Sequence, residues 1–298
     1  MKVVVLLNAT AGTADKTTDP ESVLRDAFAA HGVDATIRPL PGPEIAEAAR
    51  AFVKAPSADA LVVAGGDGTI SAVAGAVAGS DVALGVVAMG TLNHFAKDLG
   101  LPLEPREAAA VIAAGRTRKV DVAELNGRVF VNNSSVGLYP FMVARRDEHR
   151  RAKGVGKLLA TLPALWQTLS DATWHTLGIA AAGERKAVRT PSLFVGNNEY
   201  ETGLADFGSR KSLDRGALDV HVIKQQTRLG ILLLPFKSAL GRADPVHDVQ
   251  SFRCAELEIT SRSPRLQVSL DGEICTIDTP LRYRSRPGAL TVFAADRA

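Results

Sequence analysis

Strand-like apolar runs alternate with helical stretches from the first residue to about residue 115, and this alternation limits the possible folds most strongly. The strand-like runs occupy residues 2–8, 33–40, 58–64 and 81–88. Helical periodicity covers residues 21–32, 42–55 and 69–80. Strands separated by single helices form βαβ units, whose strands lie parallel in a sheet that helices cover on both faces. We therefore predict a mostly parallel α/β domain in residues 1–120.

The rest of the chain has short strands separated by turn residues, at 118–125, 128–138, 174–183, 184–198, 216–225, 254–261, 266–274 and 280–286. Linkers such as "NG" and "AAGE" favour antiparallel pairing of neighbouring strands. One helical block, residues 141–171, interrupts them. We predict a β-rich second domain in residues 121–298, with the last strand free to return to the first domain.

Composition and charge narrow the class of protein. The chain has 298 residues, enough for two domains, with 46% hydrophobic and 22% charged residues. A net charge of +3 gives no indication of a nucleic-acid partner, and no apolar run reaches the roughly eighteen residues needed to span a bilayer. The first residues resemble a strand more than a secretory leader. We expect a cytoplasmic protein whose two cysteines, Cys254 and Cys275, are reduced and inert.

Glycine-rich segments follow three of the predicted strands. The stretch "LVVAGGDGTISA" ends a strand at Gly65 and starts a helix after Thr69. A similar segment, Gly90-Thr91-Leu92-Asn93, follows the next strand, and the first strand ends in Asn8-Ala9-Thr10-Ala11-Gly12. Free N–H groups at a helix start favour an anion, and glycines let a phosphate approach the backbone. If these strands are neighbours, the segments converge on one phosphate-binding site.

The pair Asp67-Gly68 has an alternative interpretation, since Asp-Gly is a common hairpin turn. An alanine-rich helical pattern follows it instead of a returning strand, which disfavours the hairpin. The segment matches neither of the two commonest nucleotide loops, GxGxxG and GxxxxGK[ST].

These motifs resemble those of the diacylglycerol kinase and sphingosine kinase-like lipid kinases, most closely the soluble bacterial members. The resemblance rests on Gly65–Thr69, on Gly90–Asn93, on Asn197-Asn198 followed by Gly203, and on Asp271-Gly272-Glu273. It covers nearly the whole chain, although Ala9 and Ala11 replace the proline and serine that are usual in the first loop. It implies a nucleotide-binding α/β domain, a β-sandwich domain and an active site between them.

The resemblance also implies transfer of phosphate from ATP, with Mg²⁺, to a lipid hydroxyl. Diacylglycerol-like lipids are the first choice of substrate and sphingoid bases the second. The implied nucleotide-binding residues are Asn8, Ala9, Thr10, Gly12, Gly65, Gly66, Gly68, Thr69, Gly90, Thr91, Asn93, Asp271 and Gly272.

Two carboxylates compete for the catalytic role. Asp67 would hold hydrated Mg²⁺ or accept the proton of the lipid hydroxyl, and Glu273 is the other candidate base. The alternative for Glu273 is a solvated turn residue. Asp214, with the backbone carbonyl of Leu218, resembles a structural metal site of some bacterial members, although a turn aspartate that stabilises its own loop is an equal alternative.

One position departs from many relatives, which have aspartate where this chain has His94. This leaves open a nucleotide- and lipid-binding protein without catalysis, and a third alternative is a small-molecule kinase of the NAD kinase type. Apolar stretches at 158–169 and 229–240 suit an acyl chain as well as a core, and six basic residues between 145 and 157 suit an anionic membrane surface. We expect peripheral association with the inner face of the membrane. The oligomeric state is left open, a homodimer included.

Overall fold

A computed structural model of the chain describes residues 1–9, 19–137, 173–200, 210, 212–224, 227–230 and 248–295. The chain divides into two compact units. Unit 1 comprises residues 1–132, 209–216 and 286–298, and unit 2 comprises residues 133–208 and 217–285. The helical block predicted at 141–171, with its basic residues, and residues 231–240 lie outside the described part. No helix among the described residues is long and apolar enough to cross a membrane.

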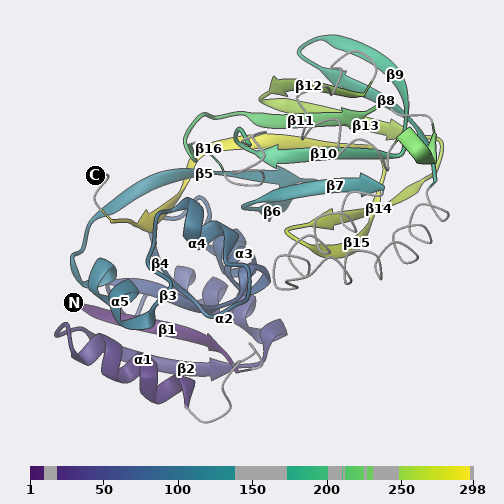
Figure 1. Cartoon of the computed structure of the whole chain (residues 1–298). Helices are drawn as coiled ribbons and strands as arrows, with labels where there is room; N and C mark the ends of the chain where they lie inside the picture. Colours follow the sequence, from purple (N-terminus) through teal and green to yellow (C-terminus); the bar gives the residue numbers. More distant parts are fainter. Residues whose placement is uncertain are drawn as a thin grey trace. The chain divides into compact units, whose positions relative to one another are not determined.

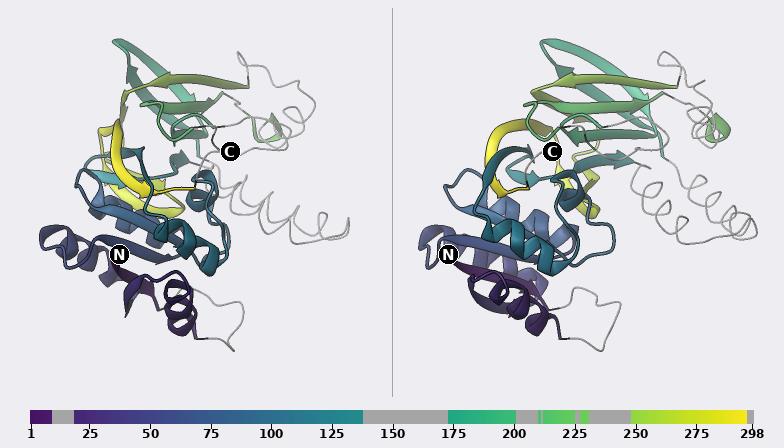
Figure 2. Two further views of the ribbon diagram at one scale, coloured as in Figure 1. Left: turned by 90° about the vertical axis from the view of Figure 1, so that its left-hand side faces the viewer. Right: turned by 60° about the vertical axis from the view of Figure 1, so that its left-hand side comes forward.

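Unit 1 contains a mostly parallel sheet with the strand order β2-β1-β3-β4-β16 (Figure 1). Its strands are β1 (Lys2–Asn8), β2 (Asp34–Leu40), β3 (Ala60–Gly65), β4 (Ala83–Ala88) and the end of β16 (Leu281–Phe293). A hairpin of β5 (Thr117–Leu125) and β6 (Arg128–Phe130) pairs with β16. Figure 2 shows the yellow end of β16 entering this unit. The parallel α/β fold predicted for the N-terminal part is confirmed.

Helices cover both faces of this sheet. Because successive strand residues point to opposite faces, β1 contributes Val4 and Leu6 to one core, and Val3, Val5 and Leu7 to another. The first core includes residues of α2 (Gly42–Lys54), α3 (Asp67–Val77) and α4 (His94–Asp98). The second includes residues of α1 (Pro20–Ala29) and α5 (Pro105–Ala113). Burial on both faces explains why β1, β3 and β4 are apolar runs, whereas β2 at the edge of the sheet contains polar residues.

Unit 2 is a sandwich of antiparallel strands. One sheet has the order β12-β11-β10-β7-β14-β15. These strands are β12 (Val249–Cys254), β11 (Leu218–Ile223), β10 (Ser192–Asn197), β7 (Asn133–Gly137), β14 (Arg265–Leu270) and β15 (Glu273–Asp278). The other layer contains β8 (His175–Ala181), β9 (Glu184–Thr190), β13 (Glu256–Ser261) and the beginning of β16. A buried hydrogen bond of 3.0 Å between the Ser134 and Tyr283 hydroxyls links the layers. The β-sandwich-like second domain is thereby confirmed.

The local sequence explains two hairpin turns, and it also explains why the single strand predicted over 184–198 was wrong. Hairpins turn at Asn126-Gly127 and Ala182-Gly183, all with positive φ, as expected from the linkers "NG" and "AAGE". The strand predicted over 184–198 is two strands, β9 and β10, which belong to different layers. Pro191 separates them because it has no N–H for a ladder, and the Thr190 hydroxyl bonds Ser192 across the break.

Candidate functional site

The carboxyl ends of β1, β3 and β4 lie side by side, because these strands are parallel neighbours. The chain moves outward in opposite directions from β1 and β3, so the order β2-β1-β3-β4 has its switch point between them. Ligands of open α/β sheets bind outside the carboxyl ends of the strands at such a point. β1 ends at Asn8 and β3 at Gly65, so two of the predicted segments flank the switch point and the third follows β4.

Gly66 and Gly90 bring the two glycine segments into backbone contact. A Cβ atom on Gly90 would lie 2.6 Å from the Cα of Gly66, closer than non-bonded carbons approach. The Met89 N–H also donates to the Gly65 carbonyl oxygen at 2.9 Å. Side chains at these positions would push the two segments apart. Because both residues are glycines, their backbone atoms are not covered by side chains at the strand ends, where a phosphate would approach.

Helix α3 begins at Asp67, whereas the sequence predicted a loop as far as Thr69. Gly66 is the N-cap, so Asp67, Gly68 and Thr69 form the first helical turn. An acidic residue is favoured there because it interacts with the free N–H groups and the helix dipole. The Asn8 side-chain amide donates to the Thr69 hydroxyl at 2.7 Å, which ties the end of β1 to this turn. The amino end of an eleven-residue helix therefore lies at the switch point, where it favours an anion.

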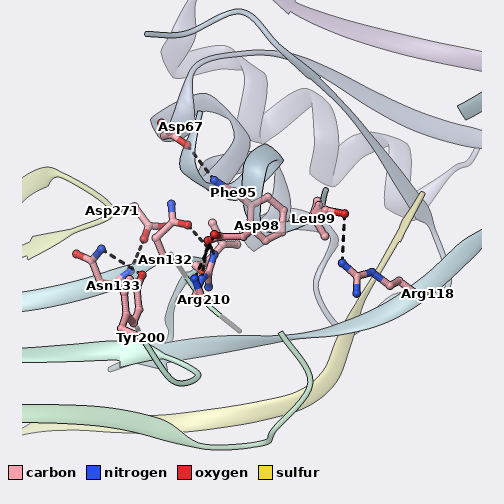
Figure 3. A network of polar contacts seen from close by, with 11 residues as sticks. Asp67, Phe95, Asp98, Leu99, Arg118, Asn132, Asn133, Tyr200, Arg210 and Asp271 are labelled. Atoms are coloured by element: carbon pink, nitrogen blue, oxygen red, sulfur yellow. Dashed lines mark hydrogen bonds and ion pairs between the residues drawn. The ribbon is translucent and has the colours of Figure 1, made fainter. Parts of the chain in front are cut away.

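Asp67 is half-buried, and its carboxylate contacts α4, the helix that follows the Gly90–Asn93 segment. Its Oδ1 accepts a long hydrogen bond of 3.4 Å from the backbone N–H of Phe95 in α4 (Figure 3). A carboxylate held in this way can bind a hydrated divalent cation or accept a proton.

Asn93 shapes the second glycine segment. It has left-handed backbone geometry (φ 53°), and its side-chain amide is buried against Gly90. The Gly90 N–H donates to Asn93 Oδ1 at 3.0 Å, and Asn93 Nδ2 donates to the Gly90 carbonyl at 2.9 Å. Thr91, in the same segment, is exposed, and so is Ala9, which directly follows β1. Thr10 and Gly12 lie outside the described residues, and contacts of all these residues with a nucleotide stay predictions.

The acidic motif of unit 2 forms the turn between β14 and β15. Asp271 and Gly272 both have positive φ (47° and 90°). The Asp271 carboxylate accepts a hydrogen bond from the Asn133 N–H at 2.9 Å, and its own N–H donates to the Asn133 carbonyl at 2.8 Å. Glu273 is exposed at the start of β15. Asp271 therefore closes the turn onto β7, whereas Glu273 is the carboxylate of the motif that faces solvent.

We expect Asp271→Ala to destabilise the protein by about 2 kcal/mol, because alanine loses the bond to Asn133 and disfavours left-handed geometry. Asp271→Asn keeps an acceptor oxygen and tolerates that geometry, so it is the matched control. Thermal unfolding of both variants checks this. Equal melting temperatures for the alanine variant and the wild type would show that the bond does not hold the turn.

The asparagine pair lies at the end of β10 and leads to a tyrosine that the sequence reasoning missed. Asn197 and Asn198 are buried, and the Asn198 N–H donates to the Ala217 carbonyl at 2.9 Å. The Tyr200 N–H then donates to the Asp219 carboxylate at 3.0 Å, and the Tyr200 hydroxyl accepts a 3.4 Å bond from Asn133 Nδ2.

The predicted structural metal site is not assembled within one unit. Asp214 belongs to unit 1, is exposed, and accepts a hydrogen bond from the Ser212 hydroxyl. Leu218 is buried at the start of β11 in unit 2. Across the described part of the chain, no group of three or more His, Cys, Asp and Glu side chains is arranged to hold a metal. The site stays a prediction.

Two family models match the chain. Residues 2–125 match the diacylglycerol kinase catalytic domain, and residues 145–294 match the YegS C-terminal NAD kinase beta sandwich-like domain. A solved structure described as a diacylglycerol kinase from Bacillus anthracis aligns with 99% of this chain and 97% of its own, with a TM-score of 0.70. At 22% sequence identity this likeness shows the fold.

Curated relatives show the same similarity. A Pseudomonas aeruginosa protein named "probable lipid kinase YegS-like" is 30% identical over 239 residues, covering 78% of this chain and 75% of that protein. The uncharacterized protein sll0036 of Synechocystis is 28% identical over 238 residues, covering 78% of this chain and 54% of that protein. The chain therefore spans about half the length of this second relative.

Proposed function

This chain belongs to the bacterial lipid kinases related to diacylglycerol kinase, and we propose that it transfers the γ-phosphoryl group of ATP to a lipid hydroxyl. Diacylglycerol-like lipids are the first choice of acceptor and sphingoid bases the second. The family predicted from the sequence motifs is confirmed by both family models. One observation supports the proposed reaction most strongly: Asp67 starts α3 at the switch point, in the glycine segment whose Gly66 is in backbone contact with Gly90 of the other.

The residues around the switch point suit the phosphates of ATP. The first turn of α3 offers N–H groups that have no partner within the helix, and Gly66 and Gly90 allow close approach to the backbone. Asn8 and Thr69 join β1 to this turn. Phosphoryl transfer requires mainly positioning and charge stabilisation, which a rigid backbone cradle supplies.

The donor set also fits Mg²⁺, because that ion usually keeps several waters and binds one or two carboxylates together with substrate phosphates. Asp67 is the carboxylate that would hold it. When bound, the ion would neutralise charge that develops on the phosphate oxygens. Asp67 alternatively takes the proton of the acceptor hydroxyl, and the exposed Glu273 is the other candidate base.

Transfer of radiolabelled phosphate from ATP to a panel of diacylglycerols, sphingoid bases and NAD tests the proposal. We expect label in a lipid, with diacylglycerol the best acceptor. Labelled NAD with unlabelled lipids would favour the NAD kinase alternative. Binding of ATP and lipid without transfer at any metal concentration would favour the binding protein without catalysis, the alternative that His94 raises.

Removal of the metal should abolish the transfer. We expect excess EDTA to reduce lipid phosphorylation to background, because the charge on the phosphates is then not neutralised. Added Mg²⁺ should restore the rate, which the same assay measures. A rate that is unchanged in EDTA, after dialysis against chelator, would contradict a role for Mg²⁺.

We also propose that the protein associates with the inner membrane face peripherally, because its proposed substrate resides there. Sedimentation with vesicles that contain anionic lipid tests this association, and neutral vesicles are the control. Equal amounts of protein in the supernatant with and without anionic vesicles would contradict it.

A further inference from the structure

A short segment from the β-rich part of the sequence belongs to unit 1. Residues 209–216 lie between stretches of unit 2, yet they are assigned to the N-terminal unit. Leu213 is buried in the core beside α2, α3 and α4, and its carbonyl accepts from the Asp121 N–H at 2.7 Å. The Gly216 N–H donates to the Asp121 carboxylate at 2.6 Å. Leu213 and Gly216 are therefore anchored in unit 1, the unit to which Arg210 also belongs.

Arg210 forms a buried ion pair with Asp98, the last residue of α4 (Figure 3). The guanidinium contacts Asp98 Oδ2 at 2.7 Å, and the exposed fractions of the two side chains are 0% and 6%. Its remaining donors reach the Val131 carbonyl at 2.6 Å and Asn132 Oδ1 at 2.9 Å. One side chain thus joins the end of α4 to residues 131–132, where the chain leaves unit 1.

Stability alone does not account for such a pair. Removing two charges from water costs several kcal/mol per ion, and well-packed apolar residues often replace a buried pair without loss of stability. The planar guanidinium instead fixes geometry, because each N–H direction is set. The observed contacts fix the position of Arg210 relative to two other parts of the chain, the end of α4 at Asp98 and residues 131–132.

Helix α4 depends on contacts of this kind for its position. It has five residues, fewer than an isolated helix needs to be stable. Phe95 and Ala96 are buried in the core, and the Leu99 carbonyl after the helix accepts from Arg118 at 3.3 Å. The helix follows the Gly90–Asn93 segment directly, and its Phe95 N–H donates to Asp67. A displacement of α4 would therefore move both the second glycine segment and the donor to Asp67.

We infer that Arg210 is a positioning residue for phosphoryl transfer, acting through Asp98 and α4 on Asp67 and the Gly90–Asn93 segment. This inference rests on the proposed function. Neither residue stands out in the sequence, because they are 112 positions apart and belong to different predicted domains.

The kinetic test compares Arg210→Lys, Arg210→Met and Asp98→Asn with the wild type. Each should lower kcat about 10- to 100-fold at saturating ATP and lipid, because small misplacements of reacting groups have effects of this size. The variant with both Asp98→Asn and Arg210→Met should be no slower than either single variant, since both changes break the same pair. The control Arg25→Met breaks the exposed Arg25–Glu21 pair of α1 and should leave kcat unchanged.

Hydrogen exchange followed by mass spectrometry supplies a second measurement that needs no lipid. Arg210→Lys and Asp98→Asn should exchange faster than wild type across residues 90–99, with β1 and α1 unchanged. Unaltered exchange at 90–99, or an equal increase throughout unit 1, would overturn the positioning role. If the wild type labels no lipid, the proposed function fails, while the exchange result and ATP binding by calorimetry still decide whether Arg210 positions α4. If Arg210→Met does not fold, the lysine and asparagine variants decide the question.

Discussion

Asp67→Asn is expected to lower kcat for lipid phosphorylation by about 10²- to 10⁴-fold, the range found when a group that transfers a proton is removed. Asparagine has nearly the same shape and keeps an oxygen that accepts from Phe95 N–H. Only the charge is lost, so the ability to hold Mg²⁺ or accept a proton disappears while the helix start remains. Loss of the favourable charge at the start of α3 should cost about 0.5 kcal/mol of stability.

The control for this variant is Asp26→Asn, which removes an exposed carboxylate on α1. Its kcat and melting temperature should match those of the wild type. Glu273→Gln tests the competing base in the same assay. Full activity in Asp67→Asn together with a large fall in Glu273→Gln would transfer the catalytic role to Glu273.

Gly90→Ala is expected to lower the melting temperature by about 5–10 °C, through a loss of about 2–3 kcal/mol. The added Cβ would lie 2.6 Å from the Gly66 Cα and 2.8 Å from Asn93 Oδ1. Neither contact can be relieved by a flexible side chain, because one atom is backbone and the other is held by the Gly90 backbone. The glycine segments must separate, so ATP affinity should fall as well, which calorimetry measures.

Gly42→Ala is the matched control. Its Cβ would meet only the Asn8 side chain, with Nδ2 at an ordinary 3.7 Å and Oδ1 at 4.0 Å. Gly42 also lies at the start of α2, where alanine is acceptable. This variant should unfold at or slightly above the wild-type temperature. Similar stability of the Gly42 and Gly90 variants would show that contact between the glycine segments is not required.

The fold could be predicted from the sequence where burial dictates the residue pattern. The strands β1, β3 and β4 of unit 1 are apolar runs because helices cover both faces of the sheet. The start of α3 could not be placed from the sequence, since Asp67-Gly68 has the composition of a turn. The structure shows that Gly66, with an extended backbone, is the N-cap of the helix. β12 was missed because half of the residues in its sequence, "VQSFRC", are polar and do not alternate regularly with the apolar ones.

The candidate site was predictable only in part, and the reason is sequence separation. Residues at the ends of β1, β3 and β4 could be grouped, because parallel neighbours bring their ends together. The partners of Asp98 and Asp271 could not be identified, since Arg210 and Asn133 come from distant segments. A single sequence gives no information on which distant polar groups meet, and their pairing follows from the packing of the whole unit.

The route of the chain has a consequence for its biosynthesis. The sheet of unit 1 needs Thr291 and Val292 of β16 beside β4, and Asp121 accepts a hydrogen bond from Gly288, 167 residues later. Contacts between distant segments form slowly, and a strand edge without its partner invites aggregation. A nascent chain that has emerged only as far as residue 120 therefore cannot complete its first unit. Most of the protein must leave the ribosome before unit 1 can mature, although most of that unit is synthesised first.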